Sequence, residues 1–202
     1  MIRAVIVDFG GVLALEPTAQ ATERLRSCCG LDAEGFIERW YEHRLPYDRG
    51  ELTAAEYWSL TGVVDESRLE AVLAADADAW SRCDPAVVAW LPALRSAGLR
   101  TALLSNMPRE QWAGLSPGFA WLTDLDELTL SFELGSAKPD EAPYRHCLGR
   151  LGVEPHEAVF VDDRAENVEA AAALGIAAFR YTGVDMLRAE LASRFDGTLP
   201  LP

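Results

Sequence analysis

An aspartate and two glycines follow the first apolar run of the chain, which reads Val5-Ile6-Val7-Asp8-Phe9-Gly10-Gly11. Such a run is typical of a buried strand, and open α/β sheets bind their ligands beyond the carboxyl ends of their strands. Glycines beside the carboxylate let main-chain N–H groups approach an anion closely. The pattern predicts a nucleophilic or metal-binding Asp8 beside an anion pocket, although an aspartate before glycines is also common in ordinary turns.

Three further polar clusters follow or lie between predicted strands. Each has an ordinary explanation by itself: a helix N-cap pair, a solvated lysine, and carboxylates that complement a helix dipole. Parallel strands bring their carboxyl ends to one edge of the sheet, so we expect the clusters to converge there. The clusters are Leu104-Ser105-Asn106, Lys138-Pro139, and Asp162-Asp163 with Asn167.

The elements that must position these residues alternate between strand-like and helix-like patterns. Apolar runs between charged or turn residues predict four strands and a weaker fifth, and helical patterns lie between most of them. The expected fold class is α/β, with a Rossmann-like parallel sheet sandwiched by helices. The expected strands are Ala4–Val7, Thr101–Leu104, Leu128–Phe132, Ala158–Val161 and Ile176–Phe179. Helices are expected over Val87–Ala97, from about Asp140 to Leu151, and from about Ala165 to Leu174.

Between residues 17 and 80 the pattern changes to helix alone. A segment of this length is too long for a loop, so it predicts an inserted all-helical cap over the sheet. The expected domains are an α/β core formed by residues 1–16 and 81–202, and a helical cap formed by residues 17–80. Helices are expected near Thr18–Cys29, Ala33–His43, Ala54–Leu60 and Ser67–Ala79, and a loose tail over Gly197–Pro202.

Composition restricts the partners. The 202 residues carry 18 lysines and arginines against 32 acidic residues, a net charge of −14, which argues against a nucleic-acid partner. The four cysteines form no C-x-x-C pair, no apolar run is long enough to span a membrane, and the first residues lack the pattern of a signal peptide. We therefore expect a cytoplasmic protein without a nucleic-acid or membrane partner; its oligomeric state stays open.

The order and spacing of these clusters resemble those of the haloacid dehalogenase-like (HAD) hydrolase superfamily, in its phosphatase branch with a small helical cap. The resemblance covers nearly the whole chain. It rests on Asp8-Phe9-Gly10-Gly11-Val12, Leu104-Ser105-Asn106, Lys138-Pro139, and Asp162-Asp163 with Asn167.

The resemblance implies a Mg²⁺-dependent phosphatase for a small phosphorylated substrate, which could be a sugar phosphate. Asp8 would attack phosphorus and form an aspartyl-phosphate, and Lys138 would balance the carboxylates and orient the phosphate. Mg²⁺ would be held by Asp8, the carbonyl of Gly10 and Asp163, with Asp162 close by. Phosphoryl oxygens would be bound by Ser105, Asn106 and the amides around Phe9, Gly10 and Gly11, and Asn167 would have a supporting role.

One position departs from the family pattern. Most phosphatases of the family carry a second aspartate two residues after the nucleophile, where this chain has Gly10, so the source of proton transfer is open. Tyr47, Asp48 and Glu51 are candidates for a substitute in the cap. The alternatives to a phosphatase are a metal-free 2-haloacid dehalogenase and a non-catalytic binding or regulatory protein on the same scaffold.

Substrate choice is expected to come from the cap, where five aromatic residues could face the pocket. Aromatic residues at helical spacing more often form the interior of a helical domain. The five are Trp40, Tyr41, Tyr47, Tyr57 and Trp58.

Overall fold

A five-stranded parallel sheet forms the centre of the computed structural model, which describes residues 1–202. The strands are β1 (Ala4–Val7), β2 (Arg100–Ser105), β3 (Glu127–Leu130), β4 (Ala158–Asp162) and β5 (Ala177–Arg180). They lie in the order β3-β2-β1-β4-β5, so β1 is central and pairs with both β2 and β4. The expected α/β class is confirmed, and the carboxyl ends of β1, β2 and β4 lie side by side.

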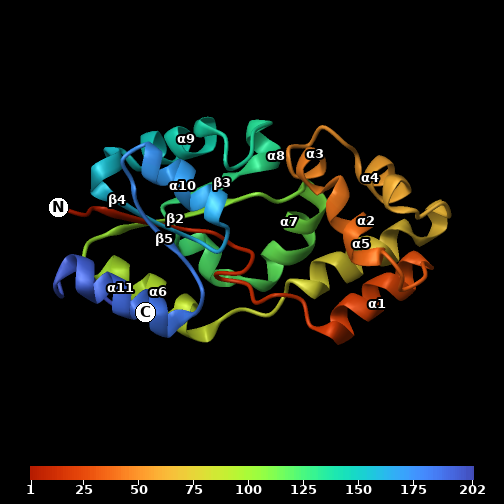
Figure 1. Cartoon of the computed structure of the whole chain (residues 1–202), viewed down its shortest axis with the longest axis horizontal. Helices are drawn as coiled ribbons and strands as arrows, with labels where there is room; N and C mark the ends of the chain where they lie inside the picture. The colour runs from red at the N-terminus through yellow and green to blue at the C-terminus, as the bar shows by residue number, and fades with distance from the viewer.

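Helices cover both faces of this sheet. In Figure 1, α9 and α10 lie on one side of the strands, and α6 and α11 lie on the other. Alternate residues of β1 enter different cores: Ile6 packs with Tyr144 of α9, whereas Val5 packs with Trp90 of α6. The helices of this part are α6 (Pro85–Ser96), α7 (Arg109–Leu115), α8 (Ser131–Leu134), α9 (Glu141–Leu151), α10 (Ala165–Ala173) and α11 (Val184–Phe195). Short 3₁₀ helices cover Ser116–Gly118, Ala120–Asp124 and Pro155–Glu157.

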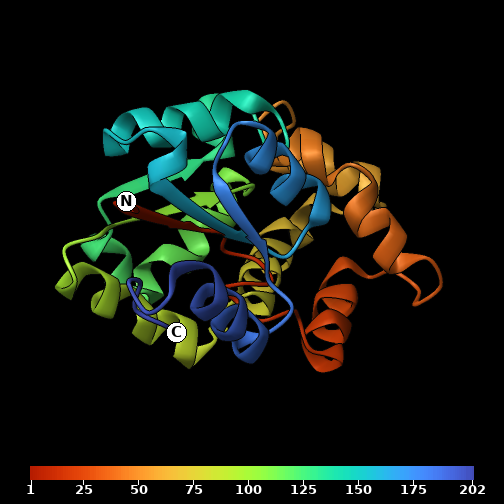
Figure 2. The same ribbon diagram turned by 60° about the vertical axis from the view of Figure 1, so that its left-hand side comes forward.

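Residues 17–80 contain only helices and lie beside the sheet, as the two views of Figures 1 and 2 agree. They enclose a hydrophobic cluster of their own, in which Trp40, Tyr57 and Trp58 are almost fully buried. The pattern fits the expected cap, and the domain boundaries at residues 16/17 and 80/81 stay a prediction. The helices are α1 (Ala19–Cys29), α2 (Phe36–Glu42), α3 (Arg44–Asp48), α4 (Ala54–Thr61) and α5 (Leu69–Ala79), with a 3₁₀ turn over Glu66–Arg68.

The helical part contacts the sheet part mainly through α7. Gly114 of α7 lies so close to α5 that a Cβ placed on it would be 2.7 Å from the Cβ of Ala77. The Tyr47 hydroxyl donates a hydrogen bond of 3.0 Å to Oε2 of Glu110, which is also on α7. Helix α7 therefore positions the helical part over the edge of the sheet at which the strands end.

The structure shifts the bounds of two expected elements and contradicts one expectation about the end of the chain. The strand expected over Leu128–Phe132 ends at Leu130, because the next residues begin α8. The helix expected over Ala33–His43 begins only at Phe36, because Gly35 adopts a left-handed conformation with φ 65°. The tail over Gly197–Pro202 is not loose: Leu199 is buried, and the Pro200 carbonyl accepts a hydrogen bond of 2.7 Å from the Trp90 indole.

No helix of the structure is long and apolar enough to cross a membrane. The cytoplasmic location stays a prediction.

Candidate active site

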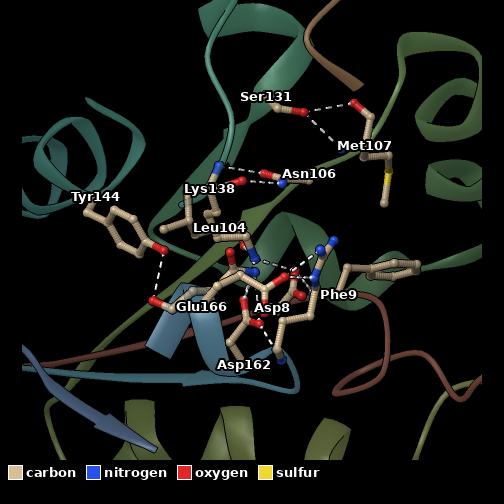
Figure 3. Close-up of polar contacts among 12 residues, drawn as sticks. Asp8, Phe9, Leu104, Asn106, Met107, Ser131, Lys138, Tyr144, Asp162 and Glu166 are labelled. Atoms are coloured by element: carbon tan, nitrogen blue, oxygen red, sulfur yellow. Dashed lines mark hydrogen bonds and ion pairs between the residues drawn. The ribbon is translucent and has the colours of Figure 1, made fainter. Parts of the chain in front are cut away.

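A buried ion-pair network lies at the carboxyl ends of β1 and β4. The ammonium of Lys138 is 2.8 Å from Oδ1 of Asp8 and 2.7 Å from Oδ2 of Asp162, and it also donates a hydrogen bond of 2.7 Å to the Leu104 carbonyl. Figure 3 shows these groups converging from separate segments. The Lys138 side chain is only 1% exposed, so its charge depends on these two carboxylates.

The loop that carries Lys138 is held to the end of β2 by one side chain. The amide of Asn106 donates a hydrogen bond of 2.8 Å to the Lys138 carbonyl, and its Oδ1 accepts one of 2.8 Å from the Lys138 N–H (Figure 3). Asn106 thus fixes the backbone of Lys138.

Ser131 links the segment after β2 to the helical part. Its hydroxyl accepts a hydrogen bond of 2.9 Å from the Met107 N–H and donates one of 2.5 Å to the Asp48 carbonyl.

The two adjacent aspartates at the end of β4 have different surroundings. Asp162 is fully buried, and besides Lys138 it accepts hydrogen bonds from the Arg164 N–H at 2.9 Å and from the Asn167 amide at 3.0 and 3.1 Å. Asp163 is partly exposed and lines a cavity. Asp8, Asp162 and Asp163 each place one carboxylate oxygen within 4.8 Å of the others, which is close enough to hold one cation.

The two glycines after Phe9 have close neighbours, and those of Gly11 leave room for glycine alone. Gly11 has φ +71°, and a Cβ there would lie 2.7 Å from Cγ of Asp163, so only glycine leaves room for that carboxylate. A Cβ on Gly10 would lie 3.3 Å from the indole of Trp80. The N–H of Phe9 donates a hydrogen bond of 2.7 Å to Oδ1 of Asp8 and orients the carboxylate.

Burial and charge shift the protonation of this site. Burial raises the pKa of Asp8 to about 8, against the lowering effect of Lys138. Burial lowers the pKa of Lys138, but Asp162 and Asp8 outweigh it, and the pKa ends above its ordinary value. The pKa of Asp163 is raised by burial and by the charge of Asp162. A single ammonium among three carboxylates leaves excess negative charge, which a bound cation would relieve.

A cavity of about 580 Å³ opens above Asp8 between the sheet and the helical part. Of the ten site residues predicted from the sequence, all but Gly11 and Asp162 line it. The predicted residues on its wall are Asp8, Phe9, Gly10, Ser105, Asn106, Lys138, Asp163 and Asn167.

Several residues of the cavity wall were not found by sequence reasoning. Tyr41 is the one expected cap aromatic that lines the cavity, and Asp48 is the one candidate proton donor among three that does so. The other wall residues carry no signal in the local sequence, because only tertiary packing brings them to the cavity. The exception is Trp80, whose position at the return to the sheet part could have indicated that it lies near the site. The residues missed are Glu16, Arg44, Leu45, Trp80, Met107, Gln111 and Arg164, whereas Pro139 was expected beside Lys138.

The family model for haloacid dehalogenase-like hydrolases matches residues 2–175. The chain therefore belongs to this hydrolase family. It is 32% identical over 188 residues to phosphoglycolate phosphatase of Rhodospirillum rubrum, covering 87% of this chain and 78% of that protein. It is 28% identical over 200 residues to (S)-2-haloacid dehalogenase 1 of Pseudomonas sp., covering 91% and 86% respectively.

Solved structures agree on the fold. A HAD family enzyme of Bacteroides thetaiotaomicron superposes with a TM-score of 0.76 at 23% identity, covering 89% of this chain and 93% of that one. Some curated relatives are much longer: the chain spans 8% of acyl-CoA dehydrogenase family member 10 of Mus musculus, to which it is 35% identical over 96 residues, 46% of this chain. These relatives include both phosphatases and dehalogenases.

Proposed function

We propose that the chain is a Mg²⁺-dependent phosphatase that hydrolyses a small phosphorylated metabolite through an aspartyl-phosphate on Asp8. Sugar phosphates are the first class of substrate to test. The observation that carries the proposal is the geometry around Lys138: one ammonium joins Asp8 to Asp162, and the Asp163 carboxylate faces the same cavity. This arrangement fits a phosphoryl group that arrives with a divalent cation.

The donors present suit magnesium. Carboxylate and carbonyl oxygens are the ligands that Mg²⁺ prefers, and Asp8, Asp163 and the Gly10 carbonyl would supply them. Asp162 already accepts hydrogen bonds at both of its carboxylate oxygens, so it would act by orienting Lys138 and Asn167. Bound Mg²⁺ would neutralise charge between the carboxylates and the phosphate. The Bacteroides thetaiotaomicron enzyme has also been solved in complex with magnesium and inorganic phosphate.

The residues of this chain would divide the work as follows. A carboxylate oxygen of Asp8 attacks phosphorus while the leaving oxygen departs, and water later breaks the aspartyl-phosphate. Lys138, Ser105 and the main-chain amides around Gly10 hold the phosphoryl oxygens. Because Gly10 supplies no acid, proton transfer is assigned to two other carboxyl groups on the cavity wall, Glu16 and Asp48.

The three carboxylates of Asp8, Asp162 and Asp163, here called the acidic triad, argue against dehalogenation. A metal-free attack on carbon would have to proceed beside two further carboxylates, Asp162 and Asp163, with only Lys138 to compensate. The absence of a carboxyl side chain at position 10 is compatible with both reactions. The triad therefore favours phosphatase chemistry over the reaction named for the Pseudomonas relative.

The test is hydrolysis of p-nitrophenyl phosphate by wild type and Asp8→Asn, with Mg²⁺ and with EDTA. We expect the wild type to turn over the substrate in Mg²⁺ but not in EDTA. Asp8→Asn should fold normally and show no turnover in either condition. Asp185→Asn is the matched control, because the Asp185 side chain is exposed on α11. Chloride release from 2-chloropropionate without metal would instead establish dehalogenation, and inactivity on every phosphate ester would favour the binding protein.

A further inference from the structure

The guanidinium of Arg44 lines the helical wall of the cavity, and all of its nitrogens are engaged. Its Nε lies 2.9 Å from Oδ1 of Asp48, and its Nη1 lies 3.4 Å from both carboxylate oxygens of Asp76. Its Nη2 donates to the side-chain carbonyl of Gln111 on α7. The Asp76 carboxylate is itself fixed by a hydrogen bond of 3.0 Å from the Trp40 indole. The arginine is therefore held by protein acceptors, and little of it is left for a ligand.

The charges around Arg44 also indicate that it is not available to an anionic ligand. Its side chain is 14% exposed and faces two carboxylates that are more deeply buried, so the group as a whole is at most neutral. The other cations on the cavity wall are also paired: the buried Lys138 with Asp8 and Asp162, and the exposed Arg164 with the exposed Glu166 at 2.5 Å. No cation on the wall lacks a carboxylate partner.

Three polar side chains on the cavity wall carry acceptor atoms. Glu16 and Asp48 present carboxylates, and Tyr41 presents a hydroxyl. A hydroxyl group of a substrate can donate to these acceptors, whereas a substrate carboxylate can only accept and would lie beside like charge. These side chains therefore favour an uncharged, hydroxylated group over a carboxylate.

We infer that the locked Arg44 network makes the cavity select phosphate esters of uncharged polyols or sugars and reject phosphate esters that carry a carboxylate. The inference rests on the proposed phosphatase function and names its class of substrate. It separates this chain from phosphoglycolate, the compound in the name of the Rhodospirillum relative, because phosphoglycolate carries such a carboxylate.

Two pairs of substrates test it, each differing by a hydroxymethyl group in place of a carboxylate. They are 2-hydroxyethyl phosphate with phosphoglycolate, and glycerol 3-phosphate with 3-phosphoglycerate. We expect kcat/KM for the hydroxyl member to exceed that for the carboxylate member by about tenfold or more in both pairs. A compound that is turned over too slowly is measured by its inhibition constant against p-nitrophenyl phosphate.

Asp48→Asn is the variant that addresses the mechanism. Removing one of the two negative charges beside Arg44 should move the hydroxyl-to-carboxylate ratio toward the carboxylate member by about tenfold. Because both substrates of a pair need the same chemistry, a general loss of rate cancels in the ratio. Asp78→Asn is the matched control, since Asp78 lies on α5 with an exposed side chain that pairs with Arg24 away from the cavity. If Asp48→Asn does not fold, Asp76→Asn makes the same charge change from the other side of Arg44.

The outcomes are distinguishable. Equal or better use of the carboxylate substrates by wild type, with p-nitrophenyl phosphate hydrolysed, overturns this inference and leaves the phosphatase intact. An unchanged ratio in a folded Asp48→Asn or Asp76→Asn variant also overturns it. If p-nitrophenyl phosphate is not hydrolysed at all, the proposed function itself fails.

Discussion

The indole of Trp80 lies over Gly10, at 3.3 Å from the point where a Cβ would project from that glycine. Trp80 follows α5 directly, where the chain returns from the helical part to the sheet. A side chain at position 10, where most phosphatases of the family carry their second aspartate, would therefore press against an aromatic ring from the helical part. Glycine at position 10 and the packing of Trp80 against it therefore go together.

We predict that Gly10→Asp alone does not raise the rate on a phosphate ester with a poor leaving group, because the Cβ of the new side chain already crowds the Trp80 indole at 3.3 Å. Gly10→Asp with Trp80→Ala removes the obstruction and should be faster than Trp80→Ala alone, by up to about 10²-fold if proton transfer limits turnover. Steady-state kinetics on glycerol 3-phosphate measure this. A rate increase in Gly10→Asp by itself would show that the indole moves freely.

The protonation of Asp8 gives a pH-dependent stability. Its pKa in the folded protein is raised by burial from 3.8 to about 8, so its contribution to stability is fully present below pH 3.8 and is lost as the pH rises through 8. Asp8→Asn has no such loss. In EDTA, we predict that the melting temperature of Asp8→Asn relative to wild type rises between about pH 4 and pH 8 and then levels off. Parallel melting curves at all pH values would contradict the burial of an ionisable Asp8.

Substitutions of the two adjacent aspartates at the end of β4 should have different effects. Asp163→Asn should weaken Mg²⁺ binding, read as a smaller rise of melting temperature on adding Mg²⁺, with little change in the metal-free protein. Asp162→Asn should destabilise the metal-free protein by about 3 kcal/mol, because it removes a charged partner from the buried Lys138. Thermal and urea unfolding with and without Mg²⁺ separate the two effects. Equal behaviour of the two variants would mean that Asp162 and Asp163 share one role.

Asn106 supplies a second test of how the lysine is placed. Asn106→Asp keeps the shape of the side chain but cannot donate to the Lys138 carbonyl when ionised, so one of the two hydrogen bonds is lost. We expect a loss of about 1–2 kcal/mol in unfolding free energy, together with a higher inhibition constant for inorganic phosphate. A change in stability without a change in phosphate inhibition would limit Asn106 to a structural role.

The sheet was predictable because its signal is local. Apolar runs such as Ala4–Val7 and Ala158–Val161 end at polar residues, and parallel pairing then brings those ends together. The same reasoning located most of the residues around Asp8, including Lys138 and Asp163. For Asp8, Ser105 and Asp163 it depended only on where each strand stops, whereas Lys138 lies in the loop after α8.

The helical wall of the cavity was not predictable in the same way. Helix α7 is only seven residues long, contains Gly114 and is followed directly by a 3₁₀ turn, so its pattern is too short to show a period. The cavity position of Arg44 depends on acceptors from α3, α5 and α7, which meet only in the folded protein. Most of the expected cap aromatics pack inside the helical part instead.

Lys138 is the only lysine in the 202 residues, whereas the other seventeen basic side chains are arginines. Its ammonium is enclosed by Asp8, Asp162 and the Leu104 carbonyl. Apart from the α-amino group of the chain, Lys138 therefore carries the one primary amine that an acylating reagent can modify. The rate at which such a reagent marks Lys138 reports how often the centre opens to solvent, without a mutation or an added fluorophore.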